Sequence, residues 1–345
     1  MKRASILLLW IFAAGSLLAA EGDDGLSSGM VNPGYVEKPA WFKHSFLDLK
    51  EDIWEASAEG KRVILYFYQD GCPYCAKLLS VNWKDPKIVK KTRNNFDVIA
   101  VNIWGDREVT DFSGRTLSEK RFAEINKVMY TPTLLLLNEK GEVALRINGY
   151  YPPEKFSAAL DYVAAKKENS LAFSDYYKEN SDNKASNKLH RGSNYLNKPY
   201  NLTHQARGGD KPLLVLYEQR WCAACDELHD DILQREETRK YLNKFDIAQL
   251  DRWSKDEVVT PAGKHTTALD WAHQLKINYA PSMIFFDNNG QEVFRIEAYL
   301  KAFHVQSVLD YVSSGAYKTQ PNLQRFIQSR ADAMREKGIE VDLMK

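Results

Sequence analysis

The chain lacks an excess of charge of either sign, which narrows its partners. Its 345 residues include 47 basic and 46 acidic side chains, so the formal net charge is +1. A chain so balanced has no general attraction for a polyanion, and we therefore expect no nucleic-acid partner and no binding to DNA. The length favours two domains of ordinary size, each able to bury its own core.

Long hydrophobic runs are also missing, except at the N-terminus. After Met1-Lys2-Arg3, a mostly apolar stretch covers residues 4–20 and a polar run follows it. The stretch is short for a bilayer span, and small residues precede a suitable cut after Ala20. We expect residues 1–20 to be a cleaved secretory signal peptide, with an uncleaved membrane anchor as the alternative. No cysteine lies near the cut, so a lipid anchor is not expected.

Cysteine is scarce, and the positions of the four residues are informative. They form two Cys-x-x-Cys pairs, Cys72 with Cys75 and Cys222 with Cys225. Each pair follows a short apolar run typical of a buried strand and stands where a helix must begin. Backbone N–H groups at a helix N-terminus favour thiolate over thiol, and the second cysteine lies about one turn further on. Each pair therefore supplies a nucleophile and a resolving thiol for disulfide exchange.

The two pairs belong to a tandem repeat. Cys222 lies 150 residues after Cys72, and Pro281 lies 149 residues after Pro132. Aromatic positions recur in the same register, among them Trp104 with Trp253 and Tyr150 with Tyr299. We expect them to pack in the core or at a sheet edge, with a role in a substrate groove as the alternative. The chain holds two copies, so it is a tandem pair and no solenoid.

Local patterns predict the same order of elements in each copy. Within the first copy they are a helix beginning near Asp48, a strand over 63–68, a helix from about residue 72, a strand over 97–102, a helix over 118–127, a hairpin over 133–147 and a helix over 153–167. This order of strands and helices is typical of an α/β fold. Pro73 fits the first turn of the helix that carries the first cysteine pair.

The repeat and the polar segment between its copies predict the domain boundaries. We expect a signal peptide over 1–20, a first domain over 41–167, a linker over 168–194, a second domain over 195–315 and a helical tail over 320–345. The linker is rich in Asn, Ser, Lys and Gly, which favours flexibility. Apolar positions at helical spacing in the tail predict a helix docked on the second domain, with a partner-binding helix as the alternative.

The strand, the Cys-x-x-Cys helix and the Thr131-Pro132 or Ala280-Pro281 step before a hairpin together resemble the thioredoxin superfamily. The resemblance implies two tandem thioredoxin-like domains, each a central mixed sheet flanked by helices. Copy one, with its Pro-Tyr dipeptide and an insert over 104–114, is similar to exported thioredoxin-like proteins linked to sulfur oxidation. Copy two, with Trp-Cys-Ala-Ala-Cys, is similar to the C-terminal domain of the periplasmic membrane-bound disulfide reductase.

The resemblance also implies roles for individual residues. It makes Cys72 and Cys222 the attacking thiols, and Pro132 and Pro281 the cis-prolines beside them. The expected catalytic residues are Cys72, Cys75, Cys222 and Cys225. The expected substrate-binding residues are Thr131, Pro132, Ala280, Pro281, Pro73 and Tyr74. Neither a metal nor a cofactor is expected.

Both copies depart from the family pattern behind the cysteines. Thioredoxins carry a buried aspartate six residues before the first cysteine, and here that position holds Tyr66 or Leu216. We expect Asp70 and Glu218 to lie in solvent nearby, where their negative charge would raise a thiol pKa. We also expect His229 to be a solvated helix residue, with a metal-binding or acid–base role as the alternative.

The sequence thus predicts an exported, periplasmic thiol–disulfide oxidoreductase. Its expected partners are proteins that carry disulfides or thiols, and a membrane-linked thiol partner that keeps the pairs reduced in an oxidising compartment. The competing function is a thioredoxin-like chaperone or adaptor that binds extended polypeptides without turnover. Structural disulfides, or a zinc site that uses both Cys pairs, are further alternatives for the cysteines.

Overall fold

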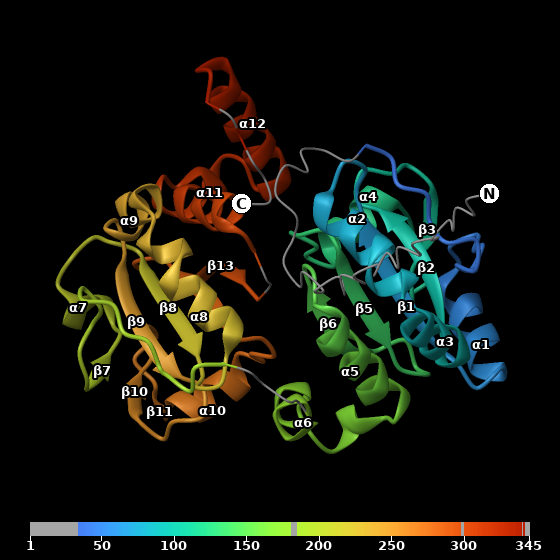
Figure 1. Cartoon of the computed structure of the whole chain (residues 1–345), viewed down its shortest axis with the longest axis horizontal. Helices are drawn as coiled ribbons and strands as arrows, with labels where there is room; N and C mark the ends of the chain where they lie inside the picture. Colours follow the sequence, from blue (N-terminus) through green and yellow to red (C-terminus); the bar gives the residue numbers. More distant parts are fainter. Residues whose placement is uncertain (1–33, 181–184, 298–299, 340, 342–345) are drawn as a thin grey trace, which may run out of the picture.

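The computed structural model describes residues 34–180, 185–297, 300–339 and 341. It contains two α/β domains side by side, the first coloured blue to green and the second yellow to red in Figure 1. The predicted signal peptide and Tyr299 lie outside the described residues. Within the described ranges, no helix combines the length and the apolar character that a membrane crossing requires.

The first domain is built on a mixed sheet whose strand order is β2-β1-β5-β6. The central strand β1 (Arg62–Tyr68) runs parallel to β2 (Phe96–Asn102) and antiparallel to β5 (Thr133–Leu137), and β5 pairs with β6 (Val143–Asn148). The strand predicted over 63–68 is therefore the centre of the sheet. Because it has neighbours on both edges and helices on both faces, every position in it can be apolar.

Side chains of β1 alternate between two apolar layers. Ile64 and Tyr66 contribute to one layer, and Val63, Leu65 and Phe67 contribute to the other. The helices of this domain are α1 (Leu49–Ala58), α2 (Pro73–Ser80), α3 (Pro86–Asn95), α4 (Glu119–Ile125) and α5 (Pro153–Ala164). Residues of α2, α3 and α5 complete the first layer, and residues of α1 and α4 complete the second. The result is a sheet between two layers of helices, as predicted for an α/β fold.

Local capping fixes where the helices begin. The Asp48 side chain accepts hydrogen bonds from the backbone N–H groups of Lys50 and Glu51, at the predicted start of α1. Asp85 caps α3 in the same way. The insert before α4 contains a short hairpin, β3 (Glu108–Thr110) with β4 (Thr116–Ser118).

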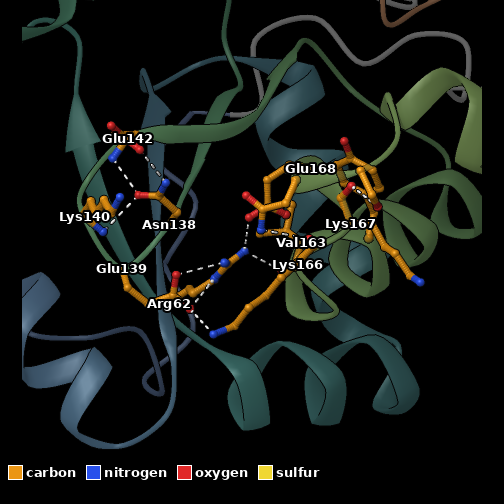
Figure 2. A network of polar contacts seen from close by, with 12 residues as sticks. Arg62, Asn138, Glu139, Lys140, Glu142, Val163, Lys166, Lys167 and Glu168 are labelled. Atoms are coloured by element: carbon orange, nitrogen blue, oxygen red, sulfur yellow. Dashed lines mark hydrogen bonds and ion pairs between the residues drawn. The ribbon is translucent and has the colours of Figure 1, made fainter.

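An ion-pair network joins three segments of the first domain at the start of β1. Arg62, at the start of β1, is 5% exposed and places its guanidinium between Glu139 of the β5–β6 turn and Glu168 beyond α5 (Figure 2). The N–O distances are 2.9 Å to Glu139 and 2.8 Å to Glu168, and Lys166 also pairs with Glu139. Because the charge of Arg62 is buried, removing its carboxylate partners would leave that charge uncompensated and would destabilise the domain.

The second domain repeats this architecture. Its sheet order is β13-β12-β8-β9, with β8 (Leu213–Glu218) parallel to β9 (Asp246–Asp251) and antiparallel to β12 (Ser282–Phe286), which pairs with β13 (Glu292–Ile296). The flanking helices are α8 (Ala223–Asp230), α9 (Glu236–Leu242), α10 (Ala268–Gln274) and α11 (Ala302–Ser313). The short strands are β7 (Tyr200–Asn201), β10 (Glu257–Val259) and β11 (His265–Thr267). Where the first domain has α1, the second has only the short helix α7 (His204–Arg207).

The segments outside the two sheets are structured as well. The expected linker contains the helix α6 (Phe173–Asn180), and its Phe173 is buried against Tyr151 and Tyr162. Near the C-terminus, α12 (Leu323–Glu336) packs on α11. Part of the segment predicted to be a polar linker is therefore an extension of the first domain, because its aromatic residues find an apolar surface.

The two domains contact each other through the loops beside their prolines. The Tyr130 hydroxyl donates a 2.5 Å hydrogen bond to the Arg295 carbonyl of β13. Tyr279, the counterpart of Tyr130, stacks on Tyr151 of the first domain at 5.5 Å between ring centroids. The Lys155 ammonium lies 3.9 Å from the Tyr279 ring centroid, which suits a cation–π contact. One apolar cluster consequently runs through both domains.

Candidate active site

The first cysteine pair lies at the start of α2, directly after β1. Cys72 is the N-cap residue of α2, and its sulfur accepts a hydrogen bond from the Cys75 N–H at 3.1 Å. The Cys72 Sγ also lies 3.2 Å from the Thr131 carbonyl oxygen, to which the thiol donates. Both cysteines carry free thiols, and each is 4% exposed. The strand-to-helix turn thus brings the sulfur of Cys72 to the loop that contains Pro132.

The two thiols of this pair differ in acidity. Burial opposes ionisation of Cys72, but hydrogen bonds from the side chains of Cys75 and Thr131 and from the backbone N–H groups of Cys75 and Tyr74 outweigh it, so the pKa of Cys72 is lowered. Burial, together with the negative charge of the Cys72 thiolate, raises the pKa of Cys75 well above its ordinary value. Cys72 is therefore the more readily ionised thiol of the pair, and Cys75 is the one that retains its proton.

A small cavity lies behind Cys75 and contains an unexpected cation. It is lined by Tyr66, Lys38, Asp70 and Cys75 among others. The Lys38 ammonium lies 3.7 Å from an Asp70 carboxylate oxygen and 3.7 Å from the centroid of the Tyr68 ring. Burial lowers the pKa of Lys38, while the charges of Asp70 and of a Cys75 thiolate act in the opposite direction. Nothing in the local sequence around Lys38 indicated this position, because it depends on how the N-terminal segment crosses the domain.

The second cysteine pair occupies the same place in the second domain. Cys222 caps α8, and it forms a disulfide with Cys225. Its sulfur lies 3.5 Å from the Ala280 carbonyl oxygen, the counterpart of the Thr131 contact. Cys222 is 6% exposed and Cys225 is 1% exposed, whereas Trp221 beside them is 51% exposed.

Two expectations for the second pair were wrong. Glu218 was expected in solvent, but it is fully buried at the end of β8. His229 was expected to be solvated, but it is 6% exposed and its Nε2 lies 2.6 Å from a Glu218 carboxylate oxygen. The Gln249 side chain donates to the other Glu218 oxygen, and the His190 ring stacks on His229. A carboxylate is buried here because two hydrogen-bond partners compensate for its loss of water.

Asp70, the other carboxylate expected in solvent, is 51% exposed and pairs with Lys38. The family position six residues before the first cysteine holds Tyr66 in the first domain and Leu216 in the second, and both side chains are buried. The first domain thus has a cation and tyrosines behind its cysteines, whereas the second has a carboxylate and a histidine.

The residues expected to bind substrate surround each cysteine pair. The Thr131–Pro132 and Ala280–Pro281 peptide bonds are both cis. Pro73 occupies the first turn of α2, and the Tyr74 hydroxyl accepts a 3.0 Å hydrogen bond from the Lys301 N–H of the second domain. The sequence placed Tyr74 in the site, but it did not indicate that this residue contacts the other domain.

A cavity of about 430 Å³ opens beside Cys72. Its first-domain walls include Gln69, Asp70, Cys72, Tyr74, Trp104, Tyr130 and Thr131. Its remaining walls come from the second domain and α12, through Leu300, His304, Gln324, Arg325, Ile327 and Gln328. By the same measure, the pocket beside Pro281 of the second domain has a volume of only about 20 Å³.

Trp104 and Trp253 each form a hydrogen bond with a glutamine that lies close in sequence to a cysteine pair. The Trp104 indole N–H donates to Gln69 at 2.7 Å, and the Trp253 indole N–H donates to Gln219 at 3.2 Å. Each glutamine lies three residues before the first cysteine of its pair. The repeat predicted the match of the two tryptophans, and the structure adds that each is anchored next to a cysteine pair.

A mixed sheet that carries a Cys-x-x-Cys helix after its central strand, with a cis-proline opposite the first sulfur, defines the thioredoxin fold. The family model of the thioredoxin-like domain matches residues 49–164 and again residues 201–313. These matches cover more than half of the chain. The chain therefore belongs to the thioredoxin-like family and carries the domain twice.

Several solved structures resemble single domains of this chain. A thioredoxin-fold protein from Helicobacter pylori is 25% identical over 35% of this chain and 80% of its own, with a TM-score of 0.31. A thioredoxin from Thermus thermophilus is 26% identical over 34% of this chain and 85% of its own, with a TM-score of 0.29. The oxidised C-terminal domain of DsbD from Neisseria meningitidis is 16% identical over 33% of this chain and 90% of its own, with a TM-score of 0.25. No curated protein matches the chain.

Proposed function

We propose that the chain is an exported thiol–disulfide oxidoreductase in which Cys72 attacks and Cys75 resolves. The observation that carries this proposal is the place of the Cys72 sulfur, at the N-cap of α2, 3.1 Å from the Cys75 backbone nitrogen and 3.2 Å from the carbonyl oxygen that precedes cis-Pro132. The lowered pKa of Cys72 and the raised pKa of Cys75 agree with it. A structural pair of cysteines has no need for one acidic thiol. An exchange site needs a thiolate that attacks and a protonated partner that waits for the mixed disulfide.

The reaction follows from the geometry. The Cys72 thiolate attacks one sulfur of a substrate disulfide and releases the other as a thiolate, which leaves a mixed disulfide on Cys72. Once the Cys72 charge is gone, Cys75 loses the negative neighbour that raises its pKa and ionises more readily. Cys75 then attacks Cys72 and releases the second substrate thiolate. The pair ends oxidised, and the substrate has gained two electrons.

The second pair is proposed to exchange disulfides by the same steps, with Cys222 as the attacking thiol and Cys225 as the resolving thiol. Its support is the matching position at the start of α8 and beside Ala280–Pro281. Disulfide or thiol proteins and a membrane-linked thiol donor are the proposed partners, and the periplasm is the proposed location. These assignments rest on the N-terminal sequence and on the chemistry of an oxidising compartment.

The test is a redox titration of the full chain without residues 1–20. The protein is equilibrated in glutathione buffers of different potential, the remaining thiols are alkylated, and each pair is read by peptide mass. We expect a reversible two-electron couple at Cys72/Cys75. Cys75→Ser should accumulate a mixed disulfide on Cys72, and Cys72→Ser should accumulate none on Cys75.

The competing function is an adaptor that binds extended polypeptides without turnover. It would be favoured if neither pair shows a reversible couple while a chain without cysteines still binds an unfolded client. If only the second pair lacks a couple, the second domain has a docking role and the proposal holds for the first domain alone.

A further inference from the structure

The cavity beside Cys72 is a composite of both domains, and this limits what can reach the sulfur. Leu300 lies just before α11 and His304 lies in its first turn, whereas Gln324, Arg325 and Gln328 lie on the first turns of α12. Together they form the wall on the second-domain side of the cavity. Cys72 is 4% exposed behind this wall. The thioredoxin-like domain that carries Cys72 therefore does not present its sulfur on an open surface.

Direct hydrogen bonds hold this wall in place. The Gln324 side chain accepts from the Gln69 amide at 3.0 Å and donates to the Met129 carbonyl at 3.1 Å. The Lys301 N–H donates to the Tyr74 hydroxyl at 3.0 Å. These bonds attach α12 and the N-cap residue of α11 to Gln69, Met129 and Tyr74 of the first domain, so the wall is held against the domain that carries Cys72.

The size of the cavity fits a small molecule. Its volume of about 430 Å³ lies within the range of small-molecule sites, which is roughly 300 to 1,000 Å³. A folded protein would have to bring its own disulfide into this space together with the surface around it. A disulfide of low molecular weight has no such surface and can enter.

The lining suggests what the small molecule carries. Arg325 supplies a positive charge at the rim, and its guanidinium carbon lies 5.6 Å from the Trp104 ring centroid. The negative charge of Asp70 is offset by Lys38 at 3.7 Å. Arginine is well suited to carboxylates, because its N–H groups match their two oxygens.

The neutral polar side chains of the lining differ in whether they already have a partner. Gln69, Gln324 and Gln328 line the cavity, but their amide groups donate to Gln324, to the Met129 carbonyl and to Asp332. The His304 Nδ1 is buried and has no hydrogen-bond partner among the described residues, although His304 lines the same cavity. A buried polar atom without a partner costs free energy, and a polar ligand in the cavity would supply the missing hydrogen bond.

We propose that this composite cavity binds a low-molecular-weight disulfide that carries carboxylate groups, with Arg325 as the carboxylate-binding residue and His304 as a polar contact. The inference rests on the proposed exchange activity of Cys72 and names its substrate class. Cys72 attacks one sulfur of the bound disulfide and one small thiolate leaves. Cys75 gives its proton to this thiolate, attacks the Cys72 sulfur and displaces the second thiolate. Two electrons thus pass from the dithiol to the small disulfide, and no other reductant is needed for one turnover.

The experiment compares single turnovers of the reduced full chain with two small disulfides. Oxidised glutathione carries carboxylates, and hydroxyethyl disulfide carries none. The loss of the Cys72 and Cys75 thiols is followed by rapid alkylation and peptide mass. Dithiothreitol, reacted with the same two disulfides, gives the ratio of rate constants that intrinsic reactivity alone produces. We expect the protein to exceed this ratio in favour of oxidised glutathione by about tenfold, as one charge-assisted hydrogen bond implies.

A matched pair of variants assigns the selectivity to one residue. Arg325→Gln should remove most of the roughly tenfold preference for oxidised glutathione. Arg335→Gln makes the same charge change near the other end of α12, outside the cavity lining, and should leave the preference intact. The third disulfide substrate is insulin, whose disulfides belong to a folded protein. We expect the protein's rate constant for insulin, relative to that for the small disulfides, to be lower than the same ratio measured with dithiothreitol.

The outcomes separate the two proposals. If no disulfide oxidises the Cys72/Cys75 pair, the exchange function itself is wrong. If all three disulfides oxidise the pair in the same ratios as dithiothreitol, the exchange function stands and the inferred substrate class is overturned. Equal losses of preference in Arg325→Gln and Arg335→Gln would likewise overturn the assignment of Arg325.

Discussion

The two cysteine pairs share their backbone setting but differ in the side chains around them. Each first cysteine caps a helix after the central strand, and each faces the carbonyl that precedes a cis-proline. Behind the first pair lie Lys38 and Tyr66, and behind the second lie Glu218 and His229. The repeat therefore preserves the geometry that exchange requires, while the groups that surround the sulfurs differ in charge.

The surroundings of the sulfurs differ in space as well as in charge. The first pair opens to a cavity of about 430 Å³ that the other domain helps to form. In the second domain, a largely apolar pocket of about 20 Å³ lies beside Ala224 and Pro281, and Cys222 and Cys225 are joined in a disulfide. Two copies of one fold thus place a dithiol beside a large cavity and a disulfide beside a small pocket, although all four sulfurs are nearly buried.

The largest expected effect comes from removing each pair in turn. A chain with Cys72→Ser and Cys75→Ser should reduce hydroxyethyl disulfide at least about tenfold more slowly, because the thiolate of lowered pKa is gone. The matched chain with Cys222→Ser and Cys225→Ser should keep most of the wild-type rate. The measurement is the initial rate with dithiothreitol as electron donor, corrected for the rate without protein. The reverse result would make the second domain the principal exchange site.

Sequence reasoning succeeded where the pattern is local. The apolar run over 63–68 and the cap at Asp48 each predict structure from a few neighbouring residues. The repeat at about 150 residues then carries these predictions to the second copy, and the family resemblance supplies the fold. The central strands β1 and β8 follow from runs that have no polar alternation, because both of their faces are covered.

Sequence reasoning failed where the structure depends on distant contacts. Glu218 ends an apolar strand, and its burial requires His229 and Gln249 from two other elements. The polar start of α12 contacts the first domain through Gln324, but hydrophobic periodicity predicts only the apolar face of a helix. The wall of the cavity at Cys72 could therefore not be predicted from the sequence of either copy by itself.

The next effect tests the carboxylate that distinguishes the second domain. Glu218→Leu should lower the free energy of unfolding by about 3 kcal/mol, since His229 and Gln249 each lose a buried partner. Tyr68 occupies the matching position in the first domain, and Tyr68→Phe should change stability by less than about 1 kcal/mol. Chemical denaturation followed by tryptophan fluorescence measures both. Similar losses in the two variants would show that the buried carboxylate makes no special contribution.

A pH effect tests the wall between the domains. Burial lowers the pKa of His304 to about 4 from an ordinary value of 6.5. The unfolded chain therefore takes up a proton between pH 6.5 and pH 4 while the folded chain does not, and stability falls as the pH falls through this window. The expected loss between pH 8 and pH 5 is about 2 kcal/mol.

His304→Gln should remove this part of the pH dependence, and His273→Gln on the exposed face of α10 should keep it. Burial raises the pKa of Glu297, so this residue contributes in the opposite direction as the pH falls, and it does so in both variants. The charges that line the cavity with His304, on Asp70 and Arg325, are also common to both. Parallel stability curves for the two variants and the wild type would contradict the buried, neutral state of His304.

The smallest effect concerns the hydrogen bond that Tyr130, a residue of the cavity wall, donates to the other domain. Tyr130→Phe removes one hydrogen bond between the domains, to the Arg295 carbonyl, and should cost about 1 kcal/mol. Tyr311→Phe removes a similar bond inside the second domain, from its hydroxyl to the Gln320 carbonyl, and should cost about as much. If separation of the domains limits access to Cys72, only Tyr130→Phe should speed its alkylation by iodoacetamide, by about fivefold. Equal alkylation rates in both variants would mean that reagents reach Cys72 without any opening of the contact between the domains.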